Sequence, residues 1–261
     1  MSWESAITGT DVSLRASPVE SRRFGLTISR ADVPLAVTDP DPVETVLGLL
    51  TDDASDVVVL RYPASRVDWF ARLLAPDRVL ISADVLTYWQ LAVGEGRAPE
   101  PDPSLVARPA HGIEPELVEG LVTDIFRSYG SHYLADPVLD PDAALDGYVE
   151  WAQHSASEVP SVVLEEAGTG VIGLATLAHS AGTTEILLAG IIRDAQGQHR
   201  YAHLLAGAEQ AARDREAERL VISTQAHNAG VQRAWARFGF EPVGSVHTVH
   251  AVRKDLLGGR S

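Results

Sequence analysis

The segment DAQGQHRYAHLL, from Asp194 to Leu205, carries residues that could bind an anion. It follows an apolar run and precedes an amphipathic helical pattern. The N-terminus of a helix presents unpaired N–H groups and a partial positive charge, which together bind phosphate groups. These N–H groups belong to the backbone, so they do not need glycines beyond Gly197, and Arg200 adds a cation. We therefore predict a diphosphate-binding turn; the alternative is an ordinary strand-to-helix loop with a surface arginine.

Alternating strand and helix patterns surround this turn. Apolar runs predict strands, and apolar residues at 3.6-residue spacing predict helices. In chain order the patterns predict helices at 114–127 and 140–153, a β-hairpin at 161–177, a strand at 184–192, a helix at 200–215, a strand at 219–226, a short helix at 231–240 and a strand at 245–253.

The first part of the chain has its own alternation, with helical patterns at 42–50 and 65–74 and strand patterns at 56–60 and 78–89. A proline-rich stretch then separates the two parts. We predict a smaller N-terminal α/β domain at 1–98, a linker at 99–110 and a second domain at 111–261. The predicted fold class is α/β with a mixed, α+β type of sheet.

The composition excludes several classes of partner and chemistry. The formal net charge of −15 repels nucleic acid and anionic membranes. The chain has no cysteine, which rules out a thiol nucleophile, and no group of side chains has metal-ligand spacing. The first residues lack the basic and apolar parts of a signal peptide, and no run is long enough to span a membrane. We expect a soluble, cytoplasmic protein without a metal.

Residues 112–253 resemble the GCN5-related N-acetyltransferase (GNAT) family. The likeness lies in TEILLAGII leading into QGQHRYAHLL, in STQAHNAGVQRAWARFGFEPV, and in the order of the predicted elements. The resemblance implies a C-terminal GNAT fold that binds acetyl-CoA as co-substrate and transfers its acetyl group to a small-molecule amine.

Within the family, the chain is most similar to the TDP-fucosamine N-acetyltransferase group, which acylates the 4-amino group of TDP-linked amino sugars. That group has an extra N-terminal domain and an aromatic segment like FRSYGSHYLADP, from Phe126 to Pro137. The resemblance implies a nucleotide-linked sugar as acceptor. The strand, polar loop and short helix at 57–74 and 220–238 look alike, so the N-terminal domain has a partly GNAT-like character; chance and duplication both explain this.

The resemblance also implies where the coenzyme binds. The strand at 184–192 is expected to splay from the strand at 219–226 and expose backbone groups to the pantetheine arm. The family usually has glycines at His199 and Tyr201, which this chain lacks. The expected coenzyme-binding residues are Leu188, Ala189, Ile191, Gln196, Gly197, Gln198, His199, Arg200, Tyr201, Asn228 and Trp235.

Trp235 departs from the family pattern at a catalytic position. The family often has a tyrosine there, which protonates the departing CoA thiolate. An indole N–H donates a hydrogen bond but is not acidic enough to protonate sulfur. We therefore expect Trp235 to hydrogen-bond the sulfur or to pack in the core, while another group or water supplies the proton, or the thiolate leaves unaided.

The acceptor ammonium must lose a proton before it attacks the thioester. Asp84 and His132 are the main candidate bases, with Glu185 and His203 as others. Asp84 lies among apolar residues, which raises a carboxyl pKa and suits a base. The residues expected to contact the acceptor are Asp84, His132, Tyr133, Thr224 and His250; His247 alternates with His250 on the last strand, and either histidine is more commonly structural.

Three functions stay open at this level. The favoured one is direct acetyl transfer to an amine in a ternary complex, by a monomer or homodimer. The rivals are a non-catalytic acyl-CoA-binding or regulatory module, and acylation of another small amine or of a hydroxyl.

Overall fold

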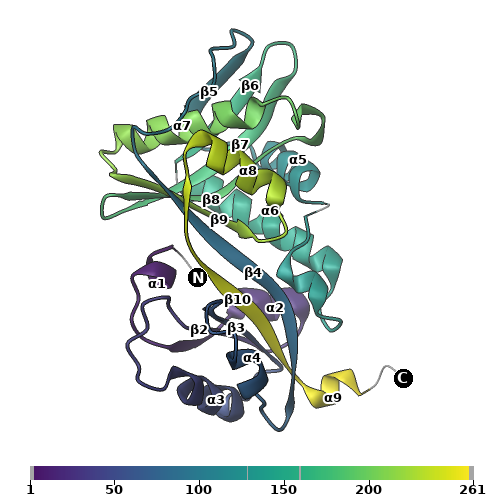
Figure 1. Ribbon diagram of the computed structural model, residues 1–261. Helices are drawn as coiled ribbons and strands as arrows, with labels where there is room; N and C mark the ends of the chain where they lie inside the picture. The colour runs from purple at the N-terminus through teal and green to yellow at the C-terminus, as the bar shows by residue number, and fades with distance from the viewer. Residues whose placement is uncertain (1–2, 128, 159, 259–261) are drawn as a thin grey trace. The chain divides into compact units, whose positions relative to one another are not determined.

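The computed structural model describes residues 3–127, 129–158 and 160–258 and has a mixed α/β fold (Figure 1). Its elements in chain order are α1 (Trp3–Ile7), β1 (Ser13–Ala16), α2 (Pro18–Phe24), β2 (Ile28–Asp32), α3 (Pro42–Asp52), β3 (Val57–Pro63), α4 (Trp69–Arg72), β4 (Arg78–Ala92), β5 (Leu105–Ala110), α5 (Pro115–Phe126), the 3-10 helix η1 (His132–Ala135), α6 (Pro141–Glu158), β6 (Ser161–Glu166), β7 (Gly170–Ser180), β8 (Thr183–Ile191), the 3-10 helix η2 (Arg193–Ala195), α7 (Arg200–Asp214), β9 (Arg219–Gln225), α8 (Ala229–Phe238), β10 (Glu241–Arg253) and α9 (Lys254–Leu257).

The chain forms two compact units, each made of separate segments. The first unit comprises Met1–Thr87, Gly130–Ala144 and Gly244–Ser261, and the second comprises Tyr88–Tyr129 and Leu145–Val243. The strands β4 and β10 contribute residues to both units.

These units differ from the continuous segments 1–98, 99–110 and 111–261 that composition predicts. Part of the predicted linker is β5, which pairs antiparallel with β6. The sequence pattern does not predict this strand, because Pro109 lies within it and most of its residues are not buried. Proline is tolerated in such a strand at a sheet edge, and β5 is last in the strand order.

In the first unit, β3 lies between β2, which is parallel to it, and β10, which is antiparallel. Every residue of β3 is buried, as expected for a strand covered on both faces. Val58 and Leu60 pack in one cluster with α3 and α4, while Val57 and Val59 pack in another with residues of η1 and α6. The residues of β3 therefore alternate between two small cores.

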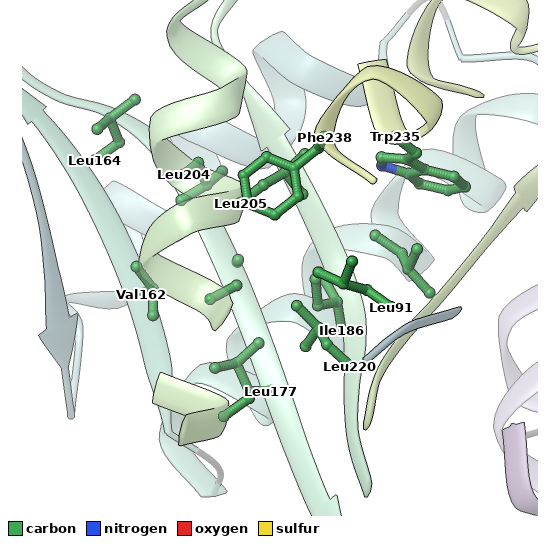
Figure 2. Packing of buried hydrophobic residues seen from close by; sticks show 14 of the residues in the cluster. Leu91, Val162, Leu164, Leu177, Ile186, Leu204, Leu205, Leu220, Trp235 and Phe238 are labelled. Atoms are coloured by element: carbon green, nitrogen blue, oxygen red, sulfur yellow. The ribbon is translucent and has the colours of Figure 1, made fainter. Parts of the chain in front are cut away.

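In the second unit the strand order is β9-β8-β7-β6-β5. The helix α7 covers one face through a 3.6-residue stripe that includes Leu204, Leu205 and Ala208, all fully buried (Figure 2). The helices α5 and α6 cover the other face, where Val118 and Leu121 pack on β6, β7 and β8. Among the described residues, no helix combines the length and the apolar composition needed to cross a membrane.

Candidate functional site

The strand β8 follows β9 for only part of its length. The parallel pairing starts at Thr183 with Arg219 and ends at Ile186 with Ile222, although β8 continues to Ile191. Over these described residues, the rest of β8 pairs only with β7. The predicted splay is therefore present, and the backbone beyond Ile186 is unpaired on the side of β9.

A β-bulge at Leu187 accounts for the splay. Ile186 pairs with Leu177 and Leu188 pairs with Thr176, so Leu187 is an extra residue in β8. The bulge also changes which face each side chain takes: Ile186 packs with α7, whereas Leu188 packs on the opposite face with α5 and α6. A bulge bends its strand and increases the local twist, which turns β8 away from β9.

The turn between β8 and α7 presents a row of backbone donors. Gly197 has φ 76° and His199, the residue before α7, has φ 61°. No side chain caps the helix. In the described part of the chain, the backbone N–H groups from Gly197 to Tyr201 donate to no protein acceptor. Five consecutive free N–H groups at a helix N-terminus form a binding site for a diphosphate.

The side chains of this turn are used to hold its shape. Gln196 Nε2 donates to the carbonyl oxygen of Ile191 at 3.2 Å, and Gln198 Nε2 donates to that of Asp194 at 3.1 Å. The guanidinium of Arg200 forms an ion pair with Glu166. Arg200 was predicted to contribute a cation to anion binding, but Glu166 already pairs with its charge. The donors available to an anion at this turn are therefore the backbone N–H groups.

Trp235 is a core residue. Its side chain is fully buried in the cluster that α7 covers (Figure 2). Its ring is edge-on to that of Trp89, with 6.1 Å between the ring centroids. Its Nε1–H donates to the hydroxyl of Tyr201 at 3.1 Å. Burial is the main cause that raises the pKa of Tyr201 to about 12, so this phenol is protonated at neutral pH. Because the indole supplies one hydrogen bond, the hydroxyl keeps its own hydrogen to donate elsewhere.

Asn228, predicted to bind the coenzyme, caps α8. Its side-chain oxygen accepts from the Val231 N–H, and its Nδ2 donates to Thr224 Oγ1 at 3.2 Å. Thr224 lies near the end of β9, and its hydroxyl is 3.1 Å from the hydroxyl of Tyr129. This chain of polar groups lies on β9 beyond the last pair with β8.

In the first unit, two of the predicted residues, His132 and His250, form a buried cluster with Asp136. The Asp136 carboxylate accepts from His250 Nδ1 at 2.9 Å, and His250 Nε2 lies 2.8 Å from His132 Nδ1. With His250 donating to Asp136, its Nε2 accepts from His132, and His132 Nε2 keeps a lone pair. Burial, followed by the nearby Arg61 cation, lowers the pKa of His132 well below its usual value.

Tyr133 belongs to a second buried cluster of this unit. Its hydroxyl donates to Glu20 at 2.6 Å, and Arg30 holds the same carboxylate through two hydrogen bonds at 2.6 and 2.8 Å. Burial alone would raise the pKa of Glu20, but Arg30, Ser17 and Tyr133 outweigh it and lower this pKa to about 2.

The lowered pKa of Glu20 predicts that the folded state loses stability in acid. A carboxyl with a lowered pKa stabilises the fold above its ordinary pKa of 4.5, and this contribution is lost as the pH falls toward about 2. The loss amounts to about 3 kcal/mol. In Glu20→Gln, urea unfolding should show lower stability at pH 7 and a weaker dependence on pH below 4.5, whereas the exposed Glu4→Gln should follow the wild type. Parallel curves for Glu20→Gln and wild type would refute this assignment.

Asp84 lies apart from the histidine cluster. Both of its carboxylate oxygens are buried and have no hydrogen-bond partner among the residues that the structure describes. Its charge acts on His247, which is hydrogen-bonded to Tyr62 and Ser82, each at 2.8 Å. Burial lowers the pKa of His247, and the charge of Asp84 opposes this shift.

The remaining candidate bases lie in the second unit. Glu185 is on the part of β8 that still pairs with β9, and His203 is half-buried on α7. The described residues contain no group of histidines and carboxylates arranged to hold a metal.

Comparison with protein families identifies this architecture. Residues 122–240 match the model of the acetyltransferase (GNAT) family. These residues form a GNAT acetyltransferase domain. The matched range contains the parted strands, the N–H row of the turn and Asn228. A comparison with curated proteins found no match.

Solved structures share the fold over most of the chain. A GNAT from Sphaerobacter thermophilus is 14% identical, with TM-score 0.62, covering 93% of this chain and 77% of that one. A GNAT from Kribbella flavida is 16% identical, with TM-score 0.52, covering 87% and 81%. A tandem GNAT protein from the clavulanic acid biosynthesis pathway is 12% identical, with TM-score 0.56, covering 87% and 77%. The shared fold therefore extends beyond the GNAT domain.

Of the predicted coenzyme residues, Leu188, Ala189 and Ile191 lie on the end of β8, and Gln196 to Tyr201 form the turn into α7. Trp235 contacts Tyr201 from α8, whereas Asn228 caps α8. The structure places Asp84, His132, Tyr133 and His250 in the first unit. Sequence reasoning missed the Tyr201 hydroxyl as the partner of Trp235 and Tyr129 as the partner of Thr224. The aromatic composition of the FRSYGSHY segment was the signal available for Tyr129.

Proposed function

We propose that the chain transfers an acetyl group from acetyl-CoA to the amine of a nucleotide-linked amino sugar. The observation that carries the acetyl-CoA part is the row of free N–H groups beside the unpaired end of β8. The N–H row suits the diphosphate, and the backbone groups of β8 beyond Ile186 that face away from β7 suit the amides of the pantetheine arm. The GNAT domain supports the small-molecule acetyl transfer as a whole.

The amino-sugar part is supported by the likeness of FRSYGSHYLADP to the TDP-fucosamine group. The net charge of −15 favours instead the rival acceptor class, a small amine with several cationic groups such as an aminoglycoside. The proposal implies a cytoplasmic reaction, because its co-substrate is a cytoplasmic metabolite. The roles of Asp84, His132, Tyr133, Thr224 and His250 toward the acceptor stay predictions.

In the proposed reaction, the amine nitrogen attacks the thioester carbon, the C–N bond forms and the C–S bond breaks. The nitrogen loses a proton and the sulfur gains one. Without a tyrosine at position 235, we propose that Tyr201 donates the proton to the sulfur. Its hydroxyl lies 3.1 Å from Trp235 Nε1, beside the position that the family gives to its acid. The resulting phenolate then recovers a proton from solvent.

Tyr201→Phe tests this role while keeping the ring in the core. We expect kcat to fall by about 10- to 100-fold, near the lower end of general acid effects because a thiolate leaves readily. The Kd for acetyl-CoA should change by less than about threefold, since the backbone N–H groups remain. Stopped-flow kinetics and calorimetry measure the two quantities.

Trp235→Phe is the matched control, because it removes the donor to Tyr201 and leaves the hydroxyl. Its kcat should exceed that of Tyr201→Phe. If both variants keep the wild-type kcat, the thiolate leaves without an acid and Tyr201 has no catalytic role.

Release of CoA thiol from acetyl-CoA tests the overall reaction. The acceptor panel comprises TDP-linked amino sugars, the free amino sugars, a polyamine, an aminoglycoside and the matching 4-hydroxy nucleotide sugar. Turnover that requires both the amine and the nucleotide supports the proposal. Turnover with the other amines or with the hydroxyl compound would show that the acceptor belongs to another class.

The rival function is a non-catalytic acyl-CoA-binding module. The observation that favours it is the engaged, non-acidic indole of Trp235 where the family has its acid. Calorimetric binding of acetyl-CoA without turnover of any acceptor would support this rival over the enzyme.

A further inference from the structure

Three polar side chains form a row across neighbouring strands of the first unit. Asp32 of β2 is the register partner of Arg61 of β3, and Arg61 is the register partner of Thr248 of β10. Residues that are register partners on adjacent strands project from the same face of the sheet. The three side chains therefore lie next to one another on one face.

The row is buried, and two of its members lack partners. Arg61 is 8% exposed and Thr248 is 0% exposed. Neither Arg61 Nε nor Thr248 Oγ1 has a hydrogen-bond partner among the described residues. A buried guanidinium without an acceptor is costly, and such groups in folded proteins are almost always satisfied by a partner or a ligand.

Two other arginines of this face have carboxylate partners. Arg15 lies 2.6 Å from the Asp32 carboxylate, an ion pair without hydrogen-bond geometry. Arg30 lies 2.6 Å from Glu20. Among the described residues, no carboxylate lies within ion-pair distance of Arg61, so its cation has no direct counter-ion there.

Arg61 also acts electrostatically on the two predicted acceptor residues of this unit. Its charge is the second cause, after burial, of the lowered pKa of His132, and it weakly opposes the burial that raises the pKa of Tyr133 to about 12. Thr248 and His250 are two residues apart on β10 and share a face, and His250 is hydrogen-bonded to His132, so the row lies beside the histidine cluster.

We propose that Arg61 and Thr248 bind the oxyanion of a small-molecule ligand, either a phosphate or a carboxylate. A guanidinium offers a planar set of donors that matches both groups, and the threonine hydroxyl adds one more donor. This site lies in the first unit and does not depend on acetyl transfer or on the N–H row of α7. It goes beyond the proposed function by adding a second, anion-selective ligand site.

Titration calorimetry at constant ionic strength tests the site, with inorganic phosphate, pyrophosphate and succinate as probes. The variants are Arg61→Met, Arg61→Lys, Thr248→Val and, as a control, Arg22→Gln, which replaces an exposed arginine of the same unit. We expect Arg61→Met to weaken binding of the preferred probe at least tenfold, Thr248→Val to weaken it severalfold, and Arg22→Gln to leave it unchanged. The preferred probe distinguishes a phosphate ligand from a carboxylate ligand.

Thermal unfolding separates binding from folding. Arg61→Met should be at least as stable as the wild type without probe, because it removes an unpaired buried charge. The probe should raise the Tm of the wild type but not of this variant. If Arg61→Met fails to fold, the near-isosteric Thr248→Val carries the test.

Acetyl-CoA binding, measured alongside, should be the same in all four variants. The proposal is overturned if no probe binds the wild type, or if Arg61→Met and Thr248→Val both bind as the wild type does. If the wild type does not bind acetyl-CoA, the proposed function is contradicted, but the proposed anion site is not.

Discussion

Deletion of Leu187 should abolish acetyl transfer while leaving the protein folded. The deletion removes the extra residue of β8, so Ile186 and Leu188 become neighbours that still pair with Leu177 and Thr176. Both side chains keep their faces, since Ile186 packs with α7 and Leu188 packs with α5 and α6. Regular alternation is thereby restored without moving a core residue.

The expected consequence lies on the other edge of β8. Without the bulge, the parallel pairing with β9 can continue past Ile222, and the backbone groups meant for the pantetheine arm bond to β9 instead. We expect kcat/KM for acetyl-CoA to fall at least about 100-fold, which corresponds to about 2.7 kcal/mol. Steady-state kinetics measures this loss, and circular dichroism with thermal unfolding confirms the fold.

The matched control is Leu187→Ala, which keeps the bulge and should retain activity within a few-fold of wild type. Amide hydrogen exchange should show new protection between Leu188 and Ile191 in the deletion variant only. A folded deletion variant with full activity would show that the parted strands are not needed for coenzyme binding.

The second large effect is expected from His199→Pro. Proline fixes φ near −65°, which is incompatible with the φ of 61° at this position, and it also removes one N–H of the row. Both changes act on the backbone at the N-terminus of α7. We expect the Kd for acetyl-CoA to rise by at least about 100-fold, because hydrogen bonds to charged groups are worth about 1.5–3 kcal/mol each. Calorimetry measures the change.

The control, His199→Gly, alters the same position in the opposite sense. It removes the imidazole, keeps the N–H and suits the positive φ. Its affinity for acetyl-CoA should equal or exceed that of the wild type, and its unfolding temperature should not fall. If both variants bind acetyl-CoA equally weakly, the imidazole rather than the backbone is the binding group.

Much of the GNAT domain is predictable from local patterns. The helix predicted at 200–215 is α7 at Arg200–Asp214, and the strand predicted at 184–192 is β8 at Thr183–Ile191. The amphipathic stripe predicts α7, and the apolar run predicts β8. Asparagine favours the N-cap position of a helix, which agrees with Asn228 at the start of α8. The anion-binding role of the turn between β8 and α7 could be predicted from its position between a strand and a helix, because its donors are backbone N–H groups.

The organisation into units depends on contacts that no local pattern encodes. The strand β10 completes the first unit by pairing with β3, for example His250 with Val59. Such pairings far apart in sequence make each unit discontinuous, so composition boundaries cannot reproduce them. The edge strand β5 was missed because Pro109 interrupts its pattern, and its pairing with β6 is not visible in the local sequence.

The site residues show the same limit. Arg200 was expected to serve the anion, but tertiary packing brings Glu166 to it. The tyrosine missing from position 235 is offset by a hydroxyl from α7, which only the fold places next to Trp235. The row of Asp32, Arg61 and Thr248 spans three strands and is invisible in a single chain segment.

Residue-resolved amide hydrogen exchange, with and without saturating acetyl-CoA, tests the central claim most directly. The free N–H groups from Gly197 to Tyr201 should exchange fast in the free protein and become strongly protected by acetyl-CoA, together with amides from Leu188 to Ile191. Desulfo-CoA should protect the first set equally, since it keeps the diphosphate. Binding of acetyl-CoA that leaves the exchange of both sets unchanged would contradict the account.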